Sequence, residues 1–208
     1  MKIAVITDEK MKEELLAGGL KDDLQVEWLK EPYPVGGADG YFDLLYDADD
    51  ERIAKLTQVQ AVPVFINAVD ITLRRLPKNF IRLNGWNGFL KRNLLELSSS
   101  GDAIKPAAEK IIAGIGRSAE WVPDIPGFIS ARVVSMIINE AYFALNEKVS
   151  TKEEIDIAMK LGTNYPYGPF EWAGIIGLKK IYDLLAKLAE TEPRYIPAPL
   201  LQKEALAT

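Results

Sequence analysis

The chain has 208 residues, of which 48% are hydrophobic and 26% charged, as in an ordinary globular protein of one large domain or two small ones. Its net charge of -5 and its lack of long basic clusters argue against a nucleic-acid-binding surface. It contains neither cysteine nor histidine, so disulfides, thiolate nucleophiles and zinc sites built from thiolate or imidazole ligands are excluded.

The amino-terminal part predicts a strand, a helix and a second strand. The apolar run at residues 2–6 is rich in β-branched residues and favours a buried parallel strand. This run is too short for the apolar core of a signal peptide, and no long apolar stretch follows, so we expect a cytoplasmic protein without a membrane partner. Residues 8–17 predict a helix with Met11, Leu15 and Leu16 on one side, and residues 24–29 predict the second strand.

A turn-rich segment at residues 32–40 leads into further alternation of strands and helices. Asp49 is a candidate cap for a helix with Ile53 and Leu56 facing inward. Strands are expected at residues 41–47, 62–68, 82–84 and 94–97, and helices at 49–57 and 101–116. This order predicts a parallel sheet with helical crossovers.

The pattern becomes helical after the segment WVPDIPG at residues 121–127, which we interpret as a domain boundary. We therefore expect one domain at residues 1–123 and an all-helical domain at residues 124–208. The segment at 128–145 is too apolar for a surface helix and predicts a central one. Thr151 with Glu154 predicts a capping box, and residues 178–188 predict a last amphipathic helix.

Several linked motifs in this last third resemble one family. They are PGFISARVV, NEAYFAL, EEIDIAMKLGTNYPYGPFEWAGIIGL and PRYIPAPLLQ, and their order and spacing resemble the carboxy-terminal domain of 3-hydroxyacyl-CoA dehydrogenases. The resemblance implies a Rossmann-like first domain, here shortened and degenerate, followed by the family's helical domain. It also implies a homodimer through the helical domain and NAD as the family's cofactor.

The first turn lacks the glycines with which the family approaches the dinucleotide. Thr7, Glu9 and Lys12 stand at the glycine positions, and Asp8 and Glu9 place negative charge where a diphosphate would lie. The alternative role of Asp8 and Glu9 is to cap the helix and favour its dipole. Only Glu31 could serve at the end of the second strand as a ribose ligand, so no cofactor is expected.

The family's catalytic region is also altered. Asn84 stands where the resemblance places the catalytic histidine, Val69 where it places a serine, and Glu96 where it places the carboxylate that orients the histidine. Asparagine has no titratable proton near neutral pH and cannot act as an acid or base. Asn84 and Glu96 remain candidate catalytic positions, while Glu96 could instead point to solvent or be hydrogen-bonded to Asn84.

The resemblance places a substrate cleft at Asn67, Asn87 and Arg132. Ala131 stands where the family has an asparagine that contacts the substrate, and alanine cannot donate that hydrogen bond. For Arg132 we favour the alternative of a salt bridge that ties its helix to the other domain. No metal site is expected, since only carboxylate ligands are available.

These losses favour a catalytically degenerate family member that acts as an acyl-CoA-related binding protein or a dimeric assembly protein. An active NAD-dependent 3-hydroxyacyl-CoA dehydrogenase is the alternative hypothesis. The expected partners are a second copy of the chain and an acyl-CoA or other small-molecule ligand, with no nucleic acid and no membrane.

Overall fold

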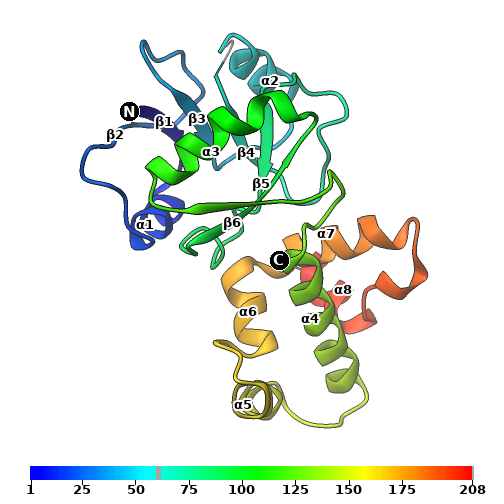
Figure 1. The fold of residues 1–208 in the computed structure, drawn as a ribbon. Coiled ribbons are helices and arrows are strands. Elements are labelled where there is room, and N and C mark those ends of the chain that lie inside the picture. Colours follow the sequence, from blue (N-terminus) through cyan, green and yellow to red (C-terminus); the bar gives the residue numbers. More distant parts are fainter. Residues whose placement is uncertain (60–61, 208) are drawn as a thin grey trace. The chain divides into compact units, whose positions relative to one another are not determined.

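The computed structural model describes residues 1–59 and 62–207 and divides the chain into two compact units, Met1–Phe128 and Ile129–Thr208. The first unit combines a sheet with helices, and the second consists of helices (Figure 1). The predicted fold class, a Rossmann-like sheet followed by an all-helical part, is therefore confirmed.

The sheet is almost entirely parallel. Within the described residues it has seven strands: β1 (Lys2–Ile6), β2 (Gln25–Leu29), β3 (Gly40–Asp43), β4 (Val64–Asn67), β5 (Phe80–Leu83), β6 (Leu94–Ser99) and β7 (Ser118–Trp121). Their order is β2-β1-β3-β4-β5-β6-β7, and the β5–β6 pair is antiparallel. The expected third strand ends at Asp43 rather than residue 47, and β7 was not predicted.

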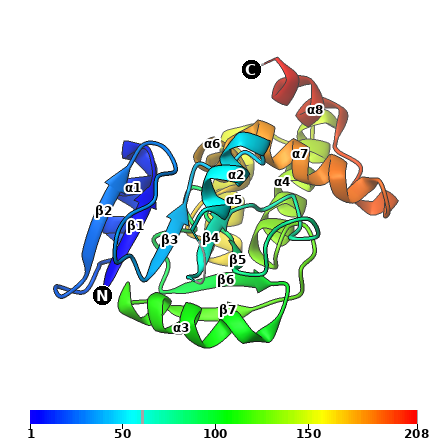
Figure 2. The ribbon, with the colours of Figure 1, turned by 90° about the horizontal axis from the view of Figure 1, so that it is seen from above.

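Helices cover both faces of the sheet because its strands are apolar on both sides. Ile3 and Val5 of β1 pack in one core cluster with α1 (Glu9–Ala17) and α3 (Lys105–Gly114), which follows a short 3-10 turn at Asp102–Ile104. Ala4 and Ile6 pack on the other face with α2 (Asp50–Thr57). Figure 2 shows α2 and α3 on opposite sides of the central strands. Successive side chains of β1 thus point to opposite faces of the sheet and pack in two separate core clusters.

The predicted inward faces of these helices are largely confirmed. Met11 and Leu15 of α1 are buried, as is Leu56 of α2. Leu16 is 45% exposed, so the expectation that it faces the core is wrong. A helix turns by about 100° per residue, and Leu16 therefore points past the edge of the face that Met11 and Leu15 bury.

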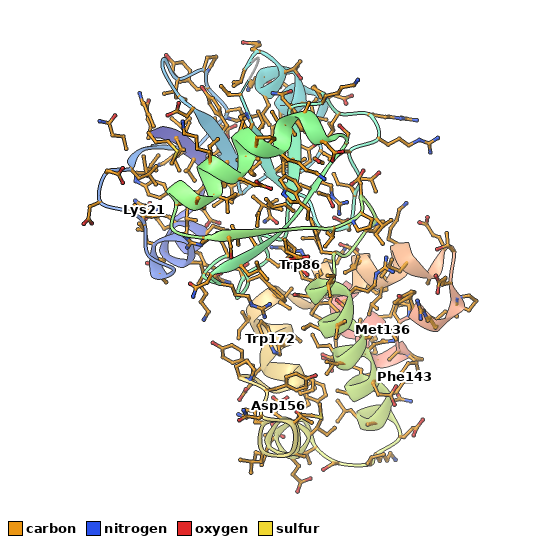
Figure 3. All side chains as sticks on the ribbon, viewed as in Figure 1. Lys21, Trp86, Met136, Phe143, Asp156 and Trp172 are labelled. Carbon is orange, nitrogen blue, oxygen red and sulfur yellow. The ribbon has the colours of Figure 1, made fainter. Side chains whose placement is uncertain are left out.

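The second unit is built around α4 (Ser130–Asn146). The other elements are α5 (Lys152–Thr163), α6 (Pro169–Ile176), α7 (Leu178–Ala189), a 3-10 turn at Pro193–Tyr195, and α8 (Pro199–Leu206), which was not predicted. Helix α4 contacts α6, α7 and α8 (Figure 3, where Met136 and Phe143 mark α4). Its buried Asn139 donates to Ile196 O and accepts from Ala198 N, which fixes the segment before α8.

Not all of the predicted central helix is covered, since Ile129 and Val133 near its start are more than half exposed. Among the described residues, no helix combines the length and the apolar character that crossing a membrane demands.

Local hydrogen bonds define where the helices of the second unit begin. Thr151 Oγ1 accepts from Glu154 N, and the Glu154 carboxylate accepts from Thr151 N, so the predicted capping box is confirmed. Asp156 of α5 caps the start of α6, because its carboxylate accepts from the backbone N–H groups of Phe170 and Glu171 (Figure 3). Such caps satisfy donors that the first helical turn leaves unpaired.

Candidate functional site

The first crossover carries a helix cap instead of a glycine-rich loop. Asp8 follows β1 with extended backbone, and its Oδ1 accepts from Met11 N at 2.8 Å. The expected capping role of Asp8 is thereby confirmed. The carboxylate takes a backbone donor that a bound anion at this helix end would otherwise use, so these residues do not fit a diphosphate held in the glycine-loop manner.

A cavity of about 450 Å³ opens beside this turn, at the carboxyl ends of β1 and β2. Such an edge of a parallel sheet is where open α/β folds place their ligands. Both charge signs border the cavity, and Lys12 Nζ lies 5.3 Å from the Trp28 ring centroid. The lining residues are Thr7, Asp8, Glu9, Lys12, Trp28, Leu29, Lys30 and Leu45.

Glu31, the candidate ribose ligand, does not line this cavity. Its exposed carboxylate lies 3.9 Å from Arg52 Nη1. The other nitrogens of Arg52 donate two hydrogen bonds of 2.6 Å to Asp43 at the end of β3. Burial raises the pKa of the Asp43 carboxyl more than these hydrogen bonds lower it. Burial and the neighbouring carboxylates raise the pKa of Tyr46 to about 12.

Asn67, at the end of β4, fixes the turn that follows β5. Its Nδ2 donates to Leu44 O and Gly85 O, and its Oδ1 accepts from Gly85 N at 3.1 Å. A Cβ atom at Gly85 would lie 2.8 Å from Asn67 Cγ, so the contact requires glycine. The structure thus gives Asn67 a role in holding the turn, while its role in a substrate cleft stays a prediction.

Asn84 and Glu96 are brought together by the antiparallel pairing of β5 with β6. Asn84 N donates to Glu96 O at 3.1 Å, and Asn84 Nδ2 donates to Glu96 Oε2 at 2.9 Å. Both side chains are buried, at 2% and 8% exposure. Of the two alternatives for Glu96, the hydrogen bond to Asn84 is the one observed. The pair therefore joins a carboxylate to an amide that exchanges no proton near neutral pH, and the catalytic roles of Asn84 and Glu96 stay predictions.

Asn87 lies on the same turn, next to a contact that sequence reasoning missed. The Gly88 N–H donates to both oxygens of Glu14, which reaches the turn from α1. Gly88 has a φ of +89°, which favours glycine. Nothing in the local pattern of α1 distinguishes Glu14 from its solvent-facing neighbours, so this pairing had no sequence signal.

The remaining candidates belong to the second unit. Ala131 is fully buried in α4. Arg132 Nη1 donates to Tyr195 Oη at 3.4 Å, and its guanidinium lies 5.5 Å from that ring's centroid. The salt bridge predicted for Arg132 and its place in a substrate cleft both stay predictions. Among residues 1–59 and 62–207, no group of three or more carboxylates is arranged to hold a metal ion.

Residues 127–207 match the family model of the 3-hydroxyacyl-CoA dehydrogenase C-terminal domain. The 3-hydroxybutyryl-CoA dehydrogenase of Bradyrhizobium diazoefficiens is 36% identical over 132 residues, which cover 61% of this chain and 45% of that protein. The 3-hydroxyadipyl-CoA dehydrogenase of Escherichia coli is 44% identical over 93 residues, covering 44% and 20% of the two chains. The matches thus span less than half of these curated relatives.

The whole fold is similar to that of solved dehydrogenase structures. The crystal structure of (S)-3-hydroxybutyryl-CoA dehydrogenase from Ralstonia eutropha superposes with a TM-score of 0.77 at 20% identity, covering 99% of this chain and 93% of that one. A Mycobacterium tuberculosis structure gives 0.79 at 16% identity, with the same coverage. At these identities the likeness concerns the fold.

The comparisons correct one expectation. The prediction that no cofactor is used is wrong, because the proteins of the matching family are NAD-dependent dehydrogenases. The missing glycines are an observation about one turn, and they do not outweigh the match to that family. Residues 127–207 thus match the C-terminal domain of the 3-hydroxyacyl-CoA dehydrogenase family, and the chain as a whole is similar in fold to solved dehydrogenases.

Proposed function

We propose that this chain binds acyl-CoA-type ligands as a homodimer and has strongly reduced dehydrogenase turnover. The ligand class is supported by the relatives, whose names include 3-hydroxybutyryl-CoA and 3-hydroxyadipyl-CoA dehydrogenases. The reduced turnover is supported by one observation, the buried Asn84 amide hydrogen-bonded to Glu96. An amide exchanges no proton with a ligand hydroxyl near neutral pH, and loss of a positioned acid or base lowers rates by about 10²- to 10⁴-fold.

A homodimer through the helical unit is supported by apolar side chains at its surface. Leu161 of α5 is 83% exposed and Ile157, one turn earlier, is 53% exposed, so α5 presents an uncovered apolar stripe. Sedimentation of the purified chain should give twice the mass of one copy, and Leu161→Lys should shift it toward the single copy. A single-copy mass for the wild type at all concentrations would contradict the dimer.

The proposed loss of turnover is tested most directly by placing a titratable side chain at position 84. Asn84→His places an imidazole beside the Glu96 carboxylate, and we expect oxidation of NADH with acetoacetyl-CoA to rise about 10²-fold or more over the wild type. Asn84→Gln is the matched control, because it keeps an amide and should not gain activity. Wild-type turnover in the usual enzymatic range of about 1 s⁻¹ or more, abolished by Glu96→Gln, would refute the proposal.

An active NAD-dependent 3-hydroxyacyl-CoA dehydrogenase is the second candidate. The cavity at the ends of β1 and β2 favours it, since this is the edge of the sheet where such folds bind ligands. NADH at about 100 times its dissociation constant should then stabilise the folded chain by about 2.7 kcal/mol, visible as a thermal shift. A thermal shift accompanied by wild-type turnover supports this candidate, and a shift without turnover supports the first.

A further inference from the structure

The cavity at the carboxyl ends of β1 and β2 is acidic on one side and basic on the other. Asp8 and Glu9 line it from the first crossover, whereas Trp28, Leu29 and Lys30 line it from the end of β2. Figure 2 shows α1, which begins at Glu9, beside these two strands. The cavity volume of about 450 Å³ lies within the range of small-molecule sites, about 300–1,000 Å³.

The end of β2 is the place where a Rossmann-like sheet contacts the ribose of an adenine nucleotide. An acidic side chain there accepts a hydrogen bond from the 2′-hydroxyl of NAD, whereas a basic one accommodates the 2′-phosphate of NADP. In this chain the first residue after β2 is Lys30. The next residue, Glu31, lies 3.9 Å from Arg52 Nη1 and does not line the cavity. At this end the lining residues therefore offer an ammonium group and no carboxylate.

The two lysines of the cavity differ in how far their charge is already neutralised. Lys12 Nζ lies 3.6 Å from Glu9 Oε2 and 5.3 Å from the centroid of the Trp28 ring. The side chain of Lys30, by contrast, has neither a hydrogen bond nor an ion pair with any residue in 1–59 and 62–207. An anionic group that enters the cavity at the end of β2 is therefore attracted by an unpaired charge.

The acidic side of the cavity does not distinguish the two dinucleotides. Asp8 and Glu9 repel the diphosphate, which NADH and NADPH have in common. The dinucleotides differ only in the 2′-phosphate, which carries a charge of about -1.5 to -2 near neutral pH. We infer that this chain prefers NADPH to NADH and that Lys30 sets the preference. This preference distinguishes the chain from the NAD-dependent proteins of the matching family, and it depends on neither acyl-CoA binding nor turnover.

The test is calorimetric titration of the purified chain with adenosine 2′,5′-bisphosphate and adenosine 5′-phosphate, which differ only in the 2′-phosphate and lack the diphosphate. A hydrogen bond between charged groups corresponds to about tenfold or more in affinity, so the bisphosphate should bind at least that much more tightly. NADPH and NADH should follow the same order. Lys30→Gln should reduce the ratio of affinities to less than about threefold, and Lys30→Asp should reverse it by providing an acceptor for the 2′-hydroxyl.

Lys21→Gln is the matched control, because it removes the same charge from an exposed side chain before the start of β2 (Figure 3). It should leave the ratio of affinities within about twofold of the wild type. Equal affinities for the two nucleotides, a ratio unchanged in Lys30→Gln, or binding of neither nucleotide would each overturn the inference. Titration with (S)-3-hydroxybutyryl-CoA tests the proposed acyl-CoA ligand separately, so the failure of one proposal is distinguishable from the failure of the other.

Discussion

Arg82 is the charged residue whose replacement should damage this fold most. It projects from β5 with a side chain that is 0% exposed, and its pKa is lowered by burial. Its Nη1 donates to Asp124 Oδ1 at 2.6 Å and to Ile125 O at 3.3 Å. Its Nε and Nη2 donate to Ala68 O and Val69 O at 2.8 and 2.9 Å. One guanidinium thus ties the segment after β7 to the segment after β4.

The magnitude follows from what Arg82→Met leaves behind. Methionine fills a similar volume and keeps the contact with the Phe128 ring, now 4.7 Å from the guanidinium carbon, so little packing is lost. Three backbone carbonyls and the Asp124 carboxylate lose the bond from Arg82, although Val69 O keeps the Gly127 N–H. Breaking a buried ion pair costs about 3–5 kcal/mol. Asp124 is 24% exposed and retains the Leu73 N–H, so we expect the lower part of that range, about 3–4 kcal/mol.

Urea unfolding followed by tryptophan fluorescence measures this loss, because Trp28, Trp86 and Trp121 belong to the first unit. In a thermal scan the same change should lower the first unit's midpoint by roughly 6–16 °C. Arg75→Met is the matched control: Arg75 is exposed, and its replacement should change stability by less than about 0.5 kcal/mol. A loss below about 1 kcal/mol for Arg82→Met would show that the buried bonds contribute little net stability.

Further predictions concern the second unit. In Gly174→Ala, inside α6, the new Cβ would have no atom within 4 Å, and the change should stabilise the helix by about 0.5–1 kcal/mol. In Gly168→Ala the new Cβ would lie 2.2 Å from Asp156 Oδ1, and the change should destabilise the unit by about 1–3 kcal/mol. Thermal melting separates the two glycines, and equal effects would contradict the cap that Asp156 forms on α6. Burial raises the pKa of Glu204, but hydrogen bonds, chiefly from Lys152, outweigh it and hold the pKa below 4.5. The stability from this carboxylate is therefore present above about pH 4.5 and lost as the pH falls further. Glu204→Gln should reduce the fall in melting temperature below that pH. An unchanged fall would contradict the stabilising role of the Glu204 carboxylate.

Several structural features could be predicted from the sequence because their causes are local. Asp8 and the Thr151–Glu154 pair cap helices through bonds to residues at most three positions away, so a short stretch of chain contains both partners. β1 was identifiable because an apolar β-branched run is stable only when buried on both faces. The family motifs of the last third lie within one continuous segment, which the match at residues 127–207 confirms.

Other parts depend on residues that are distant in sequence. Arg82 bonds to Asp124, 42 residues away in sequence, and Gly88 bonds to Glu14, 74 residues away. No periodicity in the sequence predicts either pairing. The antiparallel pairing of β5 with β6 likewise depends on tertiary structure. The residues of a short strand do not specify which other strand it pairs with.

The sequence by itself predicted that Asn84 stands at the family's histidine position, and it determined that Glu96 follows Asn84 by twelve residues. Only the tertiary structure decided which way the Asn84 amide faces, because its orientation is set by a carboxylate on the neighbouring strand. The sequence gives the chemical type of each side chain. The packing of distant segments fixes the direction in which its donor and acceptor atoms point.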